Sequence, residues 1–133
     1  PGRAFENYLQ YGGRYCIRRK IVTPEQVMEL LTACRMWPCL AHPMLYHMGY
    51  SQIREFAAHL KDLGLRGMEV YHSSHNRSQS ARLQVIAGEL GLLPSGGSDF
   101  HGANKPDVAI GRGRGGLRVS YALLKDIKED YYG

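Results

Sequence analysis

Residues 67–76 read GMEVYHSSHN. The first five, at 67–71, are typical of a short strand, and the polar cluster after them ends it. Asn76 can cap the helix that we expect next, and Gly91 can stop it. The apolar residues that we expect this helix to bury are Ala81, Val85, Ile86 and Leu90. A strand that leads directly into a helix predicts an α/β fold.

The same alternation of helix and strand extends to both sides of this stretch. Upstream, a helix begins at Thr23-Pro24, where Gln26 completes a capping box, and Pro38 ends it. The residues that we expect it to bury are Val27, Leu30, Leu31 and Cys34. An apolar run at 38–41, a helix from 51 to 63, a strand and loop at 92–101 and a last helix at 120–130 complete the order. This order calls for a parallel sheet with right-handed crossovers.

The length and charge of the chain narrow its class. A chain of 133 residues forms one domain and is too short for a complete eight-fold (β/α) barrel. We expect a lead-in segment at 1–22 and the domain at 23–133. A net charge of +5 favours anionic partners such as phosphate esters or nucleotides. No apolar stretch is long enough to span a membrane, so we expect no membrane partner and a cytoplasmic location.

Polar side chains follow every predicted strand. His42 comes after the first, His72 and His75 after the second, and Asp99 and His101 after the third. Because the carboxyl ends of parallel strands meet at one edge of a sheet, we expect these residues to converge there. Two imidazoles and a carboxylate, from His42, Asp99 and His101, suit Zn, Mn or Fe, while the alternative for His42 is a hydrogen bond at a strand end.

Three strands at similar intervals suggest an arc of a barrel, and an arc leaves two open edges. We therefore expect missing strands, supplied by another segment or by self-association through the open edges. The chain opens at Pro1 rather than at Met, which indicates a piece of something longer.

The motifs AHP at 41–43, GMEVYHSSH at 67–75 and GGSDFHGANKPD at 96–107 together resemble the C-terminal half of the PHP (polymerase and histidinol phosphatase) family of metal-dependent phosphoesterases. The resemblance implies a partial parallel (β/α) barrel, the C-terminal part of a distorted (β/α)7 barrel that carries up to three divalent ions. It implies that His42, Asp99 and His101 are metal ligands, with Asp99 also catalytic. The family's N-terminal ligands have no counterpart here, because the chain starts after them.

A second group of residues is implied to bind the phosphate. His75 would bind or protonate it, and His72 would assist. Lys105 and two arginines, Arg112 and Arg114, are the basic candidates. For each of these residues the alternative is a solvated loop position.

Two functions from different classes follow. The first is a phosphoesterase that hydrolyses phosphate esters, of nucleotides or of oligonucleotide ends, through metal-bound hydroxide. The second is a catalytically inactive fragment that acts as a basic anion-binding or interaction module. A metal-dependent amidohydrolase is a third hypothesis. For the first function we expect a phosphorylated small molecule or nucleotide as partner.

Overall fold

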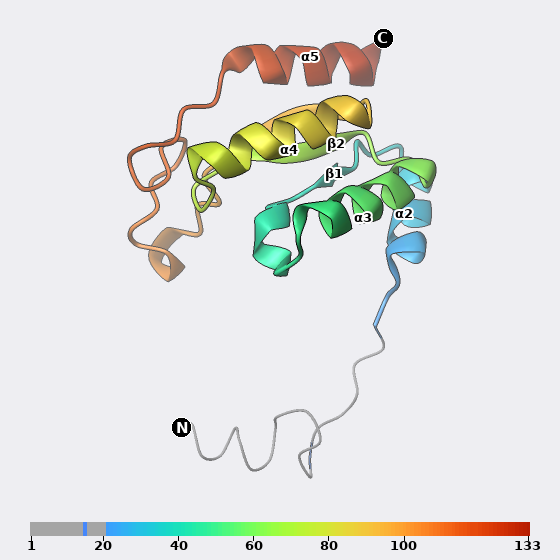
Figure 1. Ribbon diagram of the computed structural model, residues 1–133, viewed down its shortest axis with the longest axis horizontal. Helices are drawn as coiled ribbons and strands as arrows, with labels where there is room; N and C mark the ends of the chain where they lie inside the picture. The colour runs from blue at the N-terminus through green and yellow to red at the C-terminus, as the bar shows by residue number, and fades with distance from the viewer. Residues whose placement is uncertain (1–14, 16–20) are drawn as a thin grey trace.

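The computed structural model describes residue 15 and residues 21–133 (Figure 1). The predicted lead-in at 1–22 lies almost entirely outside the described residues. The elements are α2 (Pro24–Ala33), β1 (Cys39–Leu40), a 3-10 helix (Pro43–Tyr46), α3 (Tyr50–Asp62), β2 (Gly67–His72), α4 (Arg77–Glu89), β3 (Leu93–Gly97), a second 3-10 helix (Gly102–Asn104) and α5 (Tyr121–Tyr132). This succession confirms the predicted alternation of helices and strands.

The three strands form a parallel sheet in the order β1-β2-β3, which confirms the α/β class. Leu40 pairs with Met68 across the first interface, and Gly67 pairs with Leu93 across the second. The pairing of β2 with β3 is irregular between Glu69 and Tyr71. All three strands therefore point their carboxyl ends toward the same edge.

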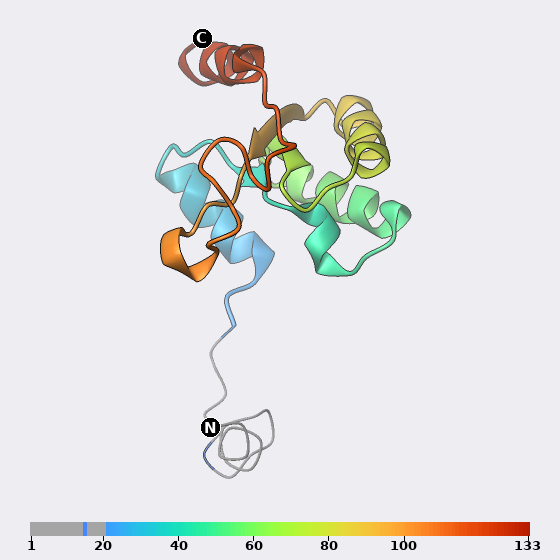
Figure 2. The same ribbon diagram turned by 90° about the vertical axis from the view of Figure 1, so that its left-hand side faces the viewer.

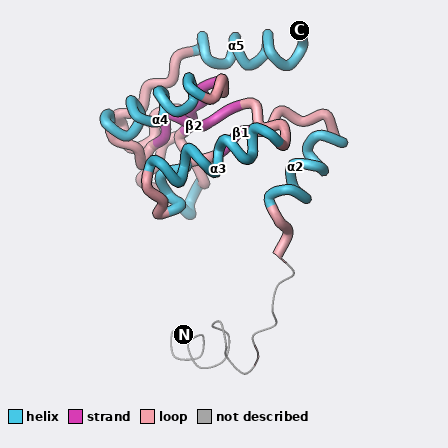
Figure 3. The backbone as a smooth tube through the Cα atoms, turned by 45° about the vertical axis from the view of Figure 1, so that its right-hand side comes forward, coloured by secondary structure: helices cyan, strands magenta, loops and turns pink. Residues whose placement is uncertain are grey.

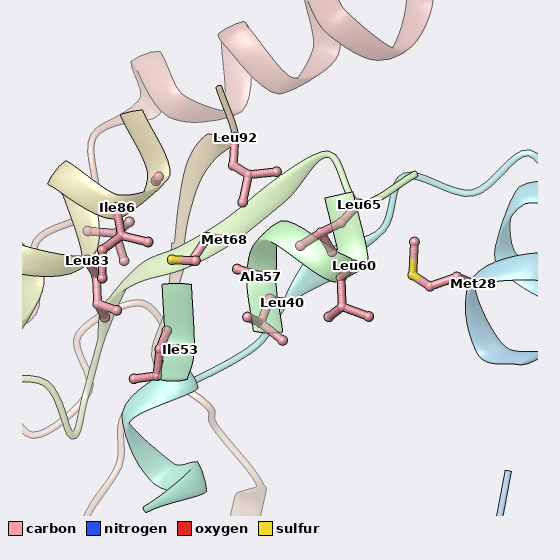
Figure 4. Close-up of a cluster of buried hydrophobic side chains, with 12 residues drawn as sticks. Met28, Leu40, Ile53, Ala57, Leu60, Leu65, Met68, Leu83, Ile86 and Leu92 are labelled. Carbon is pink, nitrogen blue, oxygen red and sulfur yellow. The ribbon is translucent and has the colours of Figure 1, made fainter. Parts of the chain in front are cut away.

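Helices α3 and α4 lie on one side of the sheet (Figures 1 and 2). Met68 and Val70 of β2 are fully buried, in a cluster with side chains of α2, α3 and α4 (Figure 4). Period-two alternation in β2 gives the reason, because residues two apart share a face of the sheet. The core thus holds β2, the strand that leads into the loop at 73–76, against both helices.

Side-chain caps determine where the helices begin. Thr23 and Gln26 form the predicted capping box at α2, and Asn76 forms one with Gln79 at α4. Each cap satisfies backbone N–H groups that the first turn leaves without partners, and is worth about 1 kcal/mol. The cap at Asn76 starts α4 directly after the loop that contains His75.

The predicted buried stripes need two corrections. In α2, Val27, Leu30 and Cys34 are exposed and Met28 is the buried residue. In α4, Ala81 is exposed and Val85 is 60% exposed, while Leu83 and Ala87 are buried with Ile86. Both helices meet the core over a narrower face than their apolar residues cover, since each has apolar residues on more than one side.

Helix α5 lies apart from the other helices (Figures 2 and 3). It contains no buried residue, but it packs against β3 and makes polar contacts as well. Asp130 accepts a hydrogen bond of 2.7 Å from Trp37 Nε1 and pairs with Arg66 at 2.8 Å. No helix in the described part of the chain is long and apolar enough to cross a membrane.

Candidate functional site

Four of the predicted residues meet at the carboxyl edge of the sheet. The ring centres of His42 and His72 are 5.7 Å apart, and those of His72 and His75 are 5.1 Å apart. His72 Nε2 lies 3.6 Å from the Asp99 Oδ2 atom, a distance that is too long for a hydrogen bond. Parallel strand ends therefore bring together side chains from all three strand-to-loop junctions.

The backbone at two of these junctions is unusual. His42 has φ 32° and Asp99 has φ 56°, in the left-handed region that favours glycine. Among the described residues only two other non-glycine residues, Arg35 and His47, have positive φ. Strained backbone of this kind persists only where the surrounding contacts hold it in place, and it is often found at functional sites.

Glu69 stabilises the backbone at His42. Its Oε2 atom accepts a hydrogen bond of 2.7 Å from the backbone N–H of His42. Sequence reasoning did not single out Glu69. The sequence feature that could have identified it is a carboxylate within the otherwise mostly apolar strand at 67–71. A charge in such a strand needs a partner, because burying an unpaired charge is costly.

Two basic side chains lie beside the Asp99 carboxylate. The Lys105 ammonium pairs with Oδ2, and His101 Nδ1 lies 3.4 Å from Oδ1. The hydrogen bond from Lys105 is the main cause that holds the pKa of Asp99 below its usual value. The side chain is 20% exposed. Asp99 is therefore ionised and still accessible.

The hydrogen bonds of His72 and His75 indicate opposite tautomers of their imidazole rings. His72 Nδ1 accepts from the Ser74 N–H at 3.1 Å, so the neutral ring carries its proton on Nε2. His75 Nδ1 lies 3.0 Å from the Val70 carbonyl, which only accepts, so its neutral ring leaves Nε2 as a lone pair. Burial lowers the pKa of His72 and keeps that ring neutral. His72 can thus donate, and His75 can accept.

The other predicted residues separate into two groups. His101 and Lys105 lie at Asp99, and Arg114 lines a cavity together with His72 and His75. Arg112 is exposed in the same loop as Arg114 and does not line that cavity. The structure therefore places every predicted residue except Arg112 at the cluster or beside it.

The donors fit a divalent ion by chemistry. His42 Nδ1 and His75 Nε2 are buried and have no hydrogen-bond partner among the described residues, and Asp99 adds a carboxylate. However, no three His, Cys, Asp or Glu side chains within residues 15 and 21–133 already form a metal-binding group. Lys105 instead neutralises Asp99. The ligand set His42, Asp99 and His101 stays a prediction.

Known proteins of similar sequence are nucleotide phosphatases and nucleases. A 5'-3' exoribonuclease of Haemophilus influenzae is 30% identical over 100 residues, which are 75% of this chain and 36% of that protein. A 3',5'-nucleoside bisphosphate phosphatase of Chromobacterium violaceum is 26% identical over 107 residues, 80% of this chain and 38% of that protein. The 5'-3' exoribonuclease Rnm of Escherichia coli is 27% identical over 108 residues, 81% of this chain and 36% of that protein. The chain thus spans just over a third of the length of these relatives.

Solved structures share the fold over almost the whole chain. An amidohydrolase of Chromobacterium violaceum matches with a TM-score of 0.69 and 21% identity, over 96% of this chain and 44% of that one. A protein of Bifidobacterium adolescentis named as a metal-dependent phosphoesterase matches with a TM-score of 0.66 and 26% identity, over 95% of this chain and 43% of that one. No family model matches the chain.

These relatives are named as exoribonucleases, a nucleoside bisphosphate phosphatase and a metal-dependent phosphoesterase. They confirm the predicted resemblance to the PHP family.

Proposed function

We propose that this chain is part of a metal-dependent phosphoesterase of the PHP type that hydrolyses phosphate esters of nucleotides or oligonucleotide ends. The observation that carries the proposal is the convergence of His42, His72, His75 and Asp99 at the carboxyl edge of a parallel sheet. The names of the sequence relatives support the nucleotide as substrate.

We assign His42, Asp99 and His101 to hold the divalent ion. When bound, such an ion lowers the pKa of a coordinated water and polarises the phosphate. Mn²⁺, Zn²⁺ and Fe²⁺ all suit this mixture of imidazole and carboxylate donors.

The remaining side chains handle the phosphate and its protons. His75 Nε2 is a buried lone pair held in place by the bond from Nδ1 to Val70, so it can take up a proton and pass it to an ester oxygen. Lys105 supplies a positive charge at Asp99. If a divalent ion bound at Asp99, Lys105 would lose this partner and could contact a phosphate oxygen instead.

The proposal includes a partner for the sheet. β1 and β3 are the edge strands of the described sheet, and the relatives are more than twice as long as the matched segment. We propose that further strands, from the rest of the polypeptide or from a second copy, extend the sheet as a barrel and add the remaining metal ligands.

Hydrolysis assays test this function. With Mn²⁺ or Zn²⁺, phosphate release from a nucleoside 3',5'-bisphosphate and nucleotide release from a 5'-phosphorylated oligonucleotide should require the metal and disappear in Asp99→Ala. Asp62→Ala, which removes an exposed carboxylate at the end of α3, is the matched control. Turnover that survives Asp99→Ala would overturn the proposal.

A second candidate is the anion-binding module without catalysis. It is favoured by the basic cavity that Arg114 lines beside His75. Absence of both turnover and metal binding, together with salt-sensitive binding of phosphate, would favour this candidate.

A further inference from the structure

The two assigned ligands with left-handed backbone, His42 and Asp99, lie on either side of the central strand. His42 follows β1 and Asp99 follows β3, and the order β1-β2-β3 places β2 between them. Their φ angles are 32° and 56°. Residues other than glycine keep such angles only where neighbouring contacts hold them. The contacts that hold these two residues identify the part of the fold that sets their positions.

The carboxylate of Glu69 reaches from β2 to the backbone on the β1 side. Its Oε2 atom accepts the hydrogen bond of 2.7 Å from the His42 N–H. Glu69 is half-buried, and it forms no ion pair with any residue in the described part of the chain. A partly buried carboxylate without a cation partner is costly for folding, so its presence favours a role at the site.

The hydroxyl of Ser73, the residue directly after β2, reaches to the β3 side. Ser73 Oγ donates a hydrogen bond of 2.6 Å to the carbonyl oxygen of Ser98, which belongs to the peptide group that leads into Asp99. Ser98 is buried, and its own Oγ atom accepts from the Gly111 N–H at 3.2 Å. The peptide group from which Asp99 turns is therefore fixed from the end of β2.

Both contacts leave the side chains of the assigned ligands unoccupied by Glu69 and Ser73. Their hydrogen bonds go to backbone atoms, at His42 N–H and at the Ser98 carbonyl. His42 Nδ1 is buried without a partner among the described residues, and the Asp99 side chain is 20% exposed. Glu69 and Ser73 thus support the residues that would bind an ion without taking the place of a ligand.

We propose that Glu69 and Ser73 are positioning residues that set the separation of His42 and Asp99 for a divalent ion. The inference rests on the proposed function, in which these two side chains hold the ion together. Glu69 acts through the backbone of His42, and Ser73 acts through the peptide group before Asp99. Loss of such outer contacts weakens metal binding by about 10-fold to 100-fold, because the ligands are no longer held in the orientation that binding needs.

Mn²⁺ binding to variants of Glu69 tests the first contact. Glu69→Leu removes the acceptor, and we expect calorimetry to show an affinity at least about 10-fold weaker. Glu69→Gln keeps an oxygen that accepts from the His42 N–H, so its affinity should stay within about 3-fold of the unmodified chain. The control Glu55→Leu, which removes an exposed carboxylate from α3, should leave the affinity unchanged. Equal losses in Glu69→Leu and Glu69→Gln would overturn the role of the hydrogen bond.

A second pair of variants tests Ser73. Ser73→Ala removes the donor to the Ser98 carbonyl and should weaken Mn²⁺ binding by about 10-fold. Ser51→Ala removes an exposed hydroxyl from α3 and serves as the control, with no change expected. Equal Mn²⁺ affinities of the two variants would overturn the assignment of Ser73.

Amide hydrogen exchange in EDTA separates positioning from ion binding. The His42 amide should exchange at least about 10-fold faster in Glu69→Leu and near the unmodified rate in Glu69→Gln. The amide of the buried Leu83 in α4 should keep its rate, because general destabilisation would raise both rates. The inference fails on its own if the unmodified chain binds Mn²⁺ and Glu69→Leu and Ser73→Ala bind it equally well. The proposed function fails on its own if no ion binds while exchange at His42 still depends on Glu69.

Discussion

His72 and Asp99 face each other across the carboxyl edge of the sheet, with Nε2 of the imidazole 3.6 Å from Oδ2 of the carboxylate. The N–H of Ser74 on Nδ1 places the His72 proton on Nε2, where it faces an acceptor. The ring is buried and neutral, and the carboxylate is ionised. Because 3.6 Å is too long for a hydrogen bond, we expect the Nε2–H dipole of His72 to orient Asp99, a role beyond the phosphate contact expected from the sequence.

Substitutions at His72 separate this role from simple packing. Gln retains an N–H donor near the position of Nε2, whereas Asn is too short to reach Asp99. We expect His72→Asn to weaken Mn²⁺ binding about 10-fold or more, and His72→Gln to stay near the unmodified affinity. Calorimetric titration checks both. Equal effects of the two variants would show that His72 only fills space.

Lys105 competes with a metal ion for Asp99. Because the ammonium pairs with Oδ2, its removal frees the carboxylate. We expect Lys105→Met to raise the affinity for Mn²⁺ several-fold and to weaken the binding of inorganic phosphate. Lys61→Met, on the exposed end of α3, is the control and should change neither. Weaker Mn²⁺ binding in Lys105→Met would contradict the competition.

Asp130 makes the attachment of α5 dependent on pH. The hydrogen bond from Trp37 is the main cause that holds the pKa of Asp130 below its ordinary value of 3.8. A depressed folded-state pKa gives stability that is present above the unfolded-state value and is lost as the pH falls through the folded-state value. Asp130→Asn should therefore lower the urea midpoint at neutral pH, and the difference should vanish in strong acid.

Asp126→Asn, also on α5 but without an ion pair among the described residues, serves as the comparison. If its urea midpoint falls as much as that of Asp130→Asn, the contacts of Asp130 do not hold the helix.

Gly96 allows the close pairing of β2 with β3. A Cβ atom there would lie 2.8 Å from both the Cβ and the carbonyl oxygen of Tyr71, so the strands would have to separate. We expect Gly96→Ala to cost about 1–3 kcal/mol in the free energy of unfolding. Gly88→Ala, in α4 with open space around it, should instead stabilise by about 0.5–1 kcal/mol. Chemical denaturation of both variants checks the sign.

Much of this fold could be predicted from local signals. The caps at Thr23 and Asn76 and the short apolar strands are recognisable without tertiary contacts, because their chemistry lies within a few residues. The convergence of His42, His75 and Asp99 followed from the rule for parallel strand ends. These inferences needed only the order of elements along the chain.

The rest depends on contacts between distant residues. The role of Glu69 depends on its hydrogen bond with the backbone N–H of His42. Arg77 and Arg118 line the same cavity, although about forty residues separate them in the sequence. The exposure of Val27 and Leu30 likewise depends on where α2 meets α3. No local pattern encodes such distances, since they arise when the helices pack on the sheet.

The most direct test of the account is a calorimetric titration of the chain with Mn²⁺ and Zn²⁺, compared with Asp99→Ala, His42→Ala and the control Asp62→Ala. The account predicts saturable binding of a divalent ion that weakens at least about 10-fold in the first two variants and stays unchanged in the third. Absence of saturable binding in the unmodified chain, or equal affinity in Asp99→Ala, would contradict it.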